Sequence, residues 1–331
     1  MCSIIGYSGL ESAAPILVKG LQKMEYRGYD SVGIATESGK KIVLKKGVGK
    51  VVEVNNSIML DTLPGNTGIG HTRWATHGKV TEKNAHPHSS NSGKIAIAHN
   101  GIIENFEELK SELQNKGYKF QSETDTEVIA NLIQLNFDET ADIKQSIMKT
   151  VNQLKGHYSF VVIFEDGTLA AARFHEPLIV GVGKNSHYIS SDVLGFIEKT
   201  DDAIYVDNED FVIVDGSGIH IFDFDGTSVK YQVTKVSKEF ADVYKGDFAH
   251  YTLKEISEQP DTILRAVDNN QIEEFVDNIK QAKNLYITGS GTSYNAAEIT
   301  KYLMSKFAKI KINTLISSEL PFSPNEIEPN S

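Results

Sequence analysis

The sequence is poor in sulfur and in positive charge. It has one cysteine in 331 residues, so it can form no intramolecular disulfide, and a reducing compartment is the expected location. No Cys/His cluster has zinc spacing, so no metal is expected. The 33 Lys and Arg residues are outnumbered by 44 Asp and Glu residues, and the net charge of −11 argues against nucleic acid or an anionic membrane as a partner. Anions must therefore be bound at local sites.

Long apolar runs are also missing. No stretch approaches the roughly 20 residues that a membrane span needs, and no charged leader followed by an apolar core opens the chain. We therefore expect a cytoplasmic protein with no membrane partner. Apolar residues still make up 40% of the chain, which is enough for a large core, and the length fits two domains.

The single cysteine, Cys2, directly follows the initiator methionine. Methionine aminopeptidase removes Met1 before a small side chain, so we expect a mature chain with a free α-amino group on Cys2. Its sulfur would be the nucleophile, and the amine, with an unperturbed pKa of about 7.7 to 8.0, would be the base. The apolar segment after it, residues 4–9, predicts a strand that holds this terminus in a sheet. The alternative for a lone cysteine is a small buried hydrophobe.

Up to residue 234 the pattern runs from strands to helices and back to strands. A helix ends near Glu25, and further helices are predicted from Asn105, after Asp125 and over residues 143–154. Short strands with Asp-Gly turns follow from Tyr158. This order predicts a layered α+β domain with helices outside packed sheets. Between the strand at 95–99 and the next helix, Asn-Gly predicts a tight turn.

The chain changes character after residue 234. Residues 235–250 are polar and charged, which is typical of a linker. Beyond them come two helices, a strand at 285–288, a glycine-rich loop at 289–293, a helix, and a strand at 310–316. That is a βαβ unit whose loop lies at the carboxyl end of its first strand, where open α/β sheets bind ligands.

Several side chains of the first part would together suit an α-amino acid. Arg73 can bind a carboxylate through two parallel hydrogen bonds, Thr76 and the Trp74 ring could complete and cover such a pocket, and Asp125 could hold an ammonium group. The alternatives are a surface ion pair for Arg73 and a helix cap for Asp125.

Asn100 and the Gly101 N–H could donate hydrogen bonds to a developing oxyanion. The loss of one such donor typically costs about 10² to 10³ in rate. The alternative is a plain turn with no catalytic part.

Six motifs, in this order, resemble the glutamine–fructose-6-phosphate aminotransferase (isomerizing) family, also called the glucosamine-6-phosphate synthases. They are Cys2-Ser3-Ile4-Ile5-Gly6, Glu25-Tyr26-Arg27-Gly28-Tyr29-Asp30-Ser31, Gly70-His71-Thr72-Arg73-Trp74-Ala75-Thr76-His77-Gly78, Asn84-Ala85-His86-Pro87-His88, His99-Asn100-Gly101-Ile102-Ile103-Glu104-Asn105 and Ser122-Glu123-Thr124-Asp125-Thr126-Glu127. The resemblance covers the whole chain.

The resemblance implies an N-terminal-nucleophile (Ntn) glutamine amidotransferase domain of the αββα type over 2–234, a linker over 235–250, and an incomplete α/β sugar-isomerase (SIS) domain over 251–331. Cys2 would attack the glutamine side-chain amide, release ammonia and leave a thioester for water to hydrolyse. The other implied roles are glutamine binding for Arg73, Thr76, His77 and Asp125, a mobile cover for Trp74, an oxyanion hole for Asn100 and Gly101, and sugar-phosphate binding for Ser290, Gly291, Thr292 and Ser293. His86 lies in a motif near the family's domain contact, and a structural role for it is equally open.

The resemblance further implies that ammonia passes to fructose 6-phosphate, giving glucosamine 6-phosphate and glutamate, with no metal or organic cofactor and as a homodimer at full length. Two departures stand out. Ser3 replaces the family's usual glycine, which we expect to shift the backbone after the nucleophile slightly. Ser331 falls before the family's second serine-rich loop, its isomerase acid/base residues and its terminal lysine, so we expect a fragment or a truncated chain.

Two other functions stay open. One is a different amidotransferase with the same first domain, such as the phosphoribosylpyrophosphate-dependent kind, which the loop at 289–295 disfavours. The other is a non-catalytic sugar-phosphate sensor in which the first domain only regulates.

Overall fold

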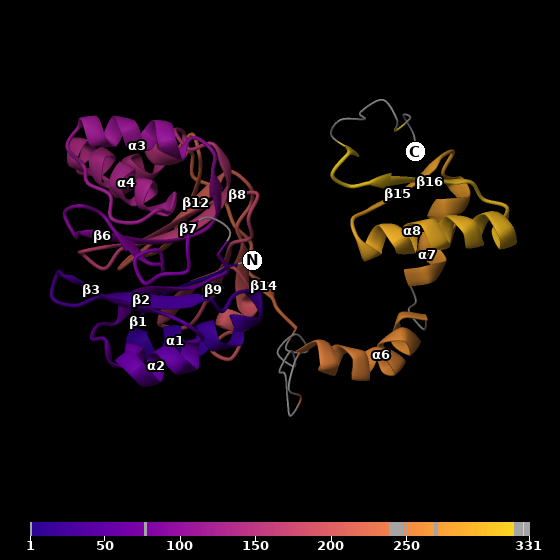
Figure 1. Ribbon diagram of the computed structural model, residues 1–331, viewed down its shortest axis with the longest axis horizontal. Coiled ribbons are helices and arrows are strands. Elements are labelled where there is room, and N and C mark those ends of the chain that lie inside the picture. The colour runs from indigo at the N-terminus through magenta and orange to yellow at the C-terminus, as the bar shows by residue number, and fades with distance from the viewer. Residues whose placement is uncertain are drawn as a thin grey trace. The chain divides into compact units, whose positions relative to one another are not determined.

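The computed structural model describes residues 2–75, 78–237, 248, 251–267, 271–320 and 327 of the chain (Figure 1). It divides into two compact units, Met1–Tyr244 and Lys245–Ser331, which we call the front unit and the second unit. Each is described by itself.

The front unit contains two antiparallel sheets. The first has the order β14-β11-β9-β10-β1-β4-β2-β3. Its strands are β14 (Thr234–Lys235), β11 (Asp202–Tyr205), β9 (Ile179–Val182), β10 (Ser186–Ser190), β1 (Ser3–Gly9), β4 (Thr67–Arg73), β2 (Ser31–Glu37) and β3 (Ile42–Val48). The second has the order β13-β12-β8-β7-β6-β5. Its strands are β13 (Gly218–Asp223), β12 (Asp210–Asp215), β8 (Leu169–Phe174), β7 (Gly156–Phe164), β6 (Ile95–Ile103) and β5 (His88–Ser89).

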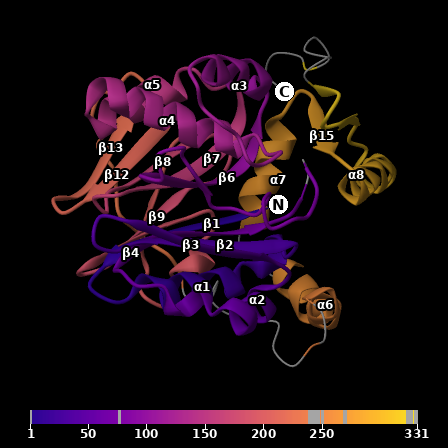
Figure 2. The ribbon, with the colours of Figure 1, turned by 60° about the vertical axis from the view of Figure 1, so that its left-hand side comes forward.

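Helices cover the outer face of each sheet. The helices α1 (Ala13–Lys23) and α2 (Val51–Ile58) lie on the first sheet, and α3 (Phe106–Asn115), α4 (Thr126–Thr140) and α5 (Ile143–Val151) lie on the second (Figures 1 and 2). The three apolar clusters of the unit fill the three resulting layers: helix against sheet, sheet against sheet, and sheet against helix. This is the predicted αββα sandwich.

Strand β1 shows how the sequence builds these layers. Alternate side chains point to opposite faces of a strand, so Ile5 and Tyr7 pack into the cluster beneath α1 while Ile4 packs between the sheets. The neighbouring strand β4 has glycine where α1 crosses it: a Cβ on Gly70 would lie 3.0 Å from Leu21 Cδ1. The helix can therefore approach the sheet closely.

The tight turn predicted at Asn100-Gly101 is wrong. Strand β6 continues through both residues to Ile103, with Asn100 opposite Ser159 and Gly101 opposite Tyr158 of β7. Gly101 has φ +107°, and a Cβ there would lie 2.0 Å from the His157 carbonyl oxygen. A side chain at this position would collide with the partner strand, so glycine permits the close approach of the two backbones.

The predicted helices at the positions of α1, α3, α4 and α5, the strand β1 and the later hairpins are confirmed. Helix α2 and strand β4 were missed. Glycines at positions 68 and 70 remove half of the apolar alternation that identifies a strand, which explains why β4 escaped a pattern-based prediction.

The second unit is a βαβ unit preceded by two helices, as predicted. Its elements are α6 (Tyr251–Val267), α7 (Gln271–Gln281), β15 (Leu285–Gly289), α8 (Thr292–Leu303) and β16 (Ile312–Ile316), and β15 pairs with β16 in parallel. Within the described part of this unit the only buried apolar side chains are those of Ala297 and Ile312.

Two further expectations concern the linker and the membrane. Lys235 lies in β14, paired opposite Asp202, and most of 236–250 lies outside the described residues. None of the helices in the described ranges combines the length and apolar character that crossing a bilayer requires.

Candidate active site

The front unit brings three strands to one end of the layer between its sheets. Ile4 on β1 and Ala98 on β6 both face this layer, so the two-residue period places Cys2 and Asn100 on the same faces. Ser3 pairs opposite Thr72 on β4, and the same register puts Arg73 opposite Cys2. Residues far apart in the sequence therefore meet because of sheet register.

The thiol and the carbonyl group of Cys2 are both held by neighbours. The Trp74 N–H donates to Cys2 Sγ at 3.3 Å, and Sγ lies 3.5 Å from the Trp74 carbonyl oxygen. The Cys2 carbonyl oxygen accepts from Arg27 Nε at 3.2 Å and from Asn100 Nδ2 at 3.3 Å. Burial raises the pKa of the thiol, while the Trp74 hydrogen bond and the positive charge of Arg73 act in the opposite direction. The thiol is thus positioned, and its thiolate needs an added base.

Arg73 and Asp125 are both buried at this site. Arg73 is 4% exposed, and its Nη1 donates to the Lys79 carbonyl oxygen at 3.2 Å, so a surface ion pair is excluded. Asp125 precedes α4 but makes no side-chain cap; its Oδ2 accepts the Ile103 N–H at 2.8 Å instead. The helix-cap alternative is wrong as well, and an anionic group borders the cavity.

Trp74 is 43% exposed, and its ring meets the Tyr29 ring edge-on, with the centroids 5.6 Å apart. The next residue, Ala75, donates its N–H to Asp30 Oδ2 at 2.8 Å, which fixes the chain where it leaves β4. The two predicted glutamine-binding residues that follow, Thr76 and His77, lie outside the described residues.

A cavity of about 30 Å³ lies beside the thiol. It is lined by Cys2, Arg73, Trp74, His86, His99, Gly101, Thr124, Asp125 and Thr126. The structure therefore gathers the predicted nucleophile, both proposed ends of the amino-acid clamp and one oxyanion donor around one small space.

A layer of four buried histidines supports this cavity, and only His86 had been singled out from the sequence. The His86 ring stacks on His71 at 4.2 Å and meets His88 edge-on at 4.8 Å, and His99 lies parallel to it at 6.5 Å. Burial lowers the pKa of all four, that of His71 to about 3. Neutral rings in this layer can each present one donor and one acceptor.

The hydrogen bonds fix some of these rings. The His99 N–H donates to His86 Nδ1 at 3.4 Å, so His86 carries its hydrogen on Nε2, which lies 3.3 Å from Thr126 Oγ1. His88 Nε2 lies 3.1 Å from Thr124 Oγ1, which leads through Ser122 to the Glu127 carboxylate. The signal available in the sequence was the recurrence of histidine in three of the motifs.

Within the described ranges, no group of three or more His, Cys, Asp or Glu residues is arranged to hold a metal ion. The hydrogen-bond partners of the ring nitrogens of His71, His86, His88 and His99 are hydroxyl, amide and carbonyl groups instead.

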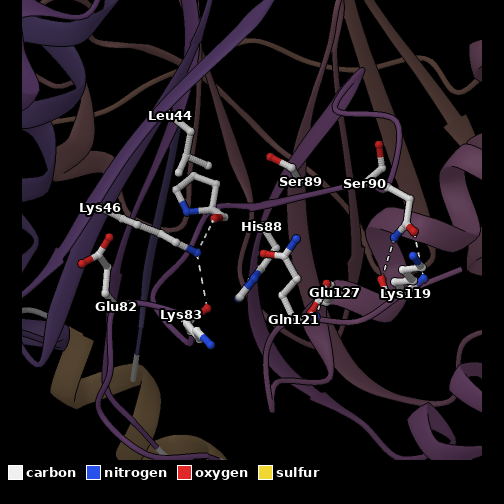
Figure 3. Close-up of a pocket in the computed structure, with 12 residues that line it drawn as sticks. Leu44, Lys46, Glu82, Lys83, His88, Ser89, Ser90, Lys119, Gln121 and Glu127 are labelled. Atoms are coloured by element: carbon white, nitrogen blue, oxygen red, sulfur yellow. Dashed lines mark hydrogen bonds between the residues drawn. The ribbon is translucent and has the colours of Figure 1, made fainter.

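A larger cavity, about 470 Å³, lies elsewhere in the front unit (Figure 3). Lys46 reaches into it, and its Nζ donates to the carbonyl oxygens of Lys83, Ala85 and Pro87. Burial lowers the pKa of Lys46 to about 8. None of the predicted site residues lines this cavity. A search for the active site by cavity volume alone would therefore have selected this cavity and not the one beside Cys2.

In the second unit the predicted phosphate loop is where the pattern put it. Gly289 ends β15, and Gly291, with φ +57°, precedes the first turn of α8. Ser290, Thr292 and Ser293 are exposed there. Their part in sugar-phosphate binding stays a prediction.

Residues 71–197 match a protein-family model described as glutamine amidotransferase domain. The front unit carries a glutamine amidotransferase domain. The whole chain is moreover a homologue of proteins named glutamine–fructose-6-phosphate aminotransferase [isomerizing]. The protein of that name from Pyrococcus horikoshii is 42% identical over 335 residues, and that from Clostridium acetobutylicum is 36% identical over 346 residues. Each alignment covers all of this chain and 56% of the relative, so the chain spans about half the length of the curated relatives it matches.

Solved structures agree on the fold of the amidotransferase domain. Glutamine phosphoribosylpyrophosphate amidotransferase from B. subtilis, complexed with ADP and GMP, is 31% identical, with a TM-score of 0.61 over 67% of this chain and 49% of that one. A structure titled as the allosteric regulatory enzyme of purine biosynthesis gives 31% identity and a TM-score of 0.60, with the same coverage. The front unit is therefore an Ntn-type αββα sandwich.

Proposed function

We propose that the front unit hydrolyses glutamine with Cys2 as the nucleophile. The observation that carries the proposal is the shared cavity, in which the thiol, a buried arginine and a buried aspartate lie together at the start of β1. Arg73 would bind the α-carboxylate and Asp125 the α-ammonium group, so that the side-chain amide of glutamine points at Sγ.

The reaction would run in two halves. Cys2 Sγ attacks the amide carbon, its proton passes to the α-amine of the mature terminus, and the carbonyl oxygen becomes an oxyanion. The amine returns a proton to the leaving nitrogen, which departs as ammonia and leaves a γ-glutamyl thioester. Water then attacks the thioester, glutamate leaves, and the thiol is restored.

Asn100 and Gly101 would stabilise the oxyanion. Asn100 Nδ2 has two hydrogens, and only one of them is needed for its bond to the Cys2 carbonyl oxygen. The second can meet the charge that develops on the substrate oxygen. The backbone N–H of Gly101 would be the other donor.

Trp74 borders the cavity together with Cys2 and Asp125. Trp74 is the lining residue with an exposed ring, and we propose that its movement opens the site. Thr76 and His77 would complete the contacts to the glutamine carboxylate.

For the sugar half we propose the reaction named by the curated relatives. Ammonia would be transferred to fructose 6-phosphate to give glucosamine 6-phosphate, in a cytoplasmic homodimer that has the full length of those relatives. The second unit would be the start of a SIS domain, with Ser290, Gly291, Thr292 and Ser293 at the helix N-terminus that receives the sugar phosphate.

The amidotransferase domain is similar to that of a phosphoribosylpyrophosphate amidotransferase, so this domain does not determine which substrate accepts the ammonia. The similarity to the aminotransferase relatives extends over the whole chain, including the second unit, and this favours fructose 6-phosphate.

The test compares wild type with Cys2→Ala and Cys2→Ser in a glutamate-release assay, with intact-mass measurement of the terminus. We expect Met1 to be absent and glutamate release to be lost in Cys2→Ala. Retained Met1, or equal glutamine hydrolysis in Cys2→Ala, would contradict the proposal and favour a non-catalytic sensor.

A further inference from the structure

The side-chain amide of Asn100 is held at both ends by different partners. Its Nδ2 donates to the Cys2 carbonyl oxygen at 3.3 Å, and its Oδ1 lies 3.2 Å from His71 Nε2. Asn100 is 3% exposed and His71 is fully buried, so water does not replace these partners. The orientation of this amide is thus decided inside the protein.

The hydrogen bonds also fix the state of the His71 ring. Its Nε2 lies 3.0 Å from the His99 carbonyl oxygen as well as near Asn100 Oδ1, and both oxygens can only accept. Nε2 must therefore carry the hydrogen, and Nδ1 is bare, buried and without a partner in the described part of the chain. The low pKa of His71 keeps the ring neutral at physiological pH.

A flipped Asn100 amide would oppose both partners. Its NH₂ group would face the N–H of His71, and its oxygen would face the Cys2 carbonyl oxygen. Two buried donors or two buried acceptors that face each other lose both hydrogen bonds. The orientation seen in the structure is the one that presents Nδ2 toward Cys2.

We propose that His71 is a positioning residue for glutamine hydrolysis: its Nε2–H holds Asn100 Oδ1, so that Asn100 Nδ2 faces the oxyanion. The inference rests on the proposed function of the Cys2 site. His71 is fully buried and its Nε2 is directed at the His99 carbonyl oxygen and at Asn100 Oδ1, so it acts through Asn100 and not on the substrate. Side chains alternate between the two faces of a strand, and this alternation turns His71 of β4 in one sheet and Asn100 of β6 in the other toward the layer between the sheets.

The competing explanation is that His71 only fills space beneath His86, on which it stacks at 4.2 Å. A packing role would alter stability without changing the chemical step. The two explanations therefore differ in kcat.

The experiment uses the full chain with His71→Gln and His71→Met. Glutamine can place an amide N–H near the position of Nε2, whereas methionine has a similar volume and no N–H donor. We expect His71→Met to lower kcat by about 10- to 100-fold, less than or equal to the loss of an oxyanion donor itself. KM for glutamine should change less than twofold, and His71→Gln should recover most of kcat.

A double-mutant cycle with Asn100→Ala identifies the route of the effect. If His71 works through Asn100, adding His71→Met to Asn100→Ala lowers kcat no further. Unchanged kcat in His71→Met, no recovery in His71→Gln, or losses that multiply in the double variant would each overturn the inference. If His71→Met does not fold by circular dichroism, His71→Asn, whose shorter amide stops short of Asn100, replaces it in the same comparison.

Glutamine hydrolysis by wild type and by Cys2→Ala is measured in the same experiment as a control. If wild type fails to hydrolyse glutamine, the proposed function fails, and the inference fails with it. If wild type is active and Cys2→Ala is not, a failed cycle counts against His71 alone.

Discussion

Asp125 lies directly before a helix but does not cap it. An aspartate before a helix normally caps it, but here Oδ2 takes the Ile103 N–H from the neighbouring strand β6, and the residue is only 8% exposed. The carboxylate is thereby oriented toward the Cys2 cavity. Sequence reasoning could name this residue as a candidate because of its motif, but it could not exclude the cap, since that depends on where β6 lies.

The Asp125→Asn variant should lose affinity for the α-ammonium group of glutamine. An asparagine oxygen can still accept the Ile103 N–H, so the local structure should be kept. We expect KM for glutamine to rise about 10- to 100-fold, which corresponds to the loss of one charged hydrogen bond of about 1.5–3 kcal/mol. Steady-state glutamate release measures this.

Glutaramate, which is glutamine without its α-amino group, serves as the matched substrate for this variant. Wild type and Asp125→Asn should handle it equally. An equal loss on both substrates would show that Asp125 does not bind the amino group.

At the scale of elements, strand β6 is the clearest case of a prediction that sequence could not complete. From the sequence, Asn100 and Gly101 are candidate oxyanion donors in a predicted tight turn, because Asn-Gly taken by itself favours a turn. The strand instead continues, since β7 supplies a register in which Gly101 meets a partner backbone. Local propensity identified the residues, and tertiary pairing decided their conformation.

Replacement of Gly101 by alanine should therefore destabilise the front unit. Its φ of +107° and a Cβ position 2.0 Å from the His157 carbonyl oxygen leave no room without a shift of β6 or β7. We expect a loss of about 2 kcal/mol or more in the free energy of unfolding, from backbone strain and displacement together. Urea denaturation followed by circular dichroism measures it.

Gly93 provides the control for this change. It also has a positive φ, +73°, but a Cβ there would meet nothing within 4 Å. Gly93→Ala should cost about 1 kcal/mol, the strain of the left-handed conformation alone. A Gly101→Ala variant as stable as Gly93→Ala would contradict the contact seen in the structure.

At the scale of the whole molecule, composition and pattern predicted the layered α+β fold, the hairpins and the later βαβ unit. They did not predict which strands would be neighbours in the two sheets. Strand β1 lies between β4 and β10, and the contact between His71 and Asn100 crosses from one sheet to the other. Such pairings depend on the joint packing of three apolar layers, and no local pattern encodes that.

The buried histidine layer makes the stability of the front unit dependent on pH. Burial lowers the pKa of His71, His86, His88 and His99 in the folded chain, while the unfolded chain binds protons with pKa about 6.5. Below that pH the unfolded state binds more protons. Stability is thus fully present above about pH 6.5 and is lost as the pH falls toward the folded pKa, by up to about 1.4 kcal/mol per pH unit for each histidine.

Urea unfolding from pH 8 to pH 5 tests this dependence. In His88→Gln, the slope of the unfolding free energy against pH below pH 6.5 should fall by up to about 1.4 kcal/mol per pH unit, the contribution of one histidine. The glutamine amide can still donate to Thr124 but does not titrate. An unchanged slope in His88→Gln would show that His88 does not contribute.

The place of β1 in the middle of its sheet has a consequence for protein synthesis. The proposed nucleophile, Cys2, directly precedes β1, and this strand pairs with β4, Thr67–Arg73, and with β10, Ser186–Ser190. Non-local pairings of this kind form late, since the intervening chain must first exist. Strand β1 can therefore be enclosed on both sides only after the chain has been synthesised as far as Ser190, so the position of Cys2 is fixed only once most of the front unit exists.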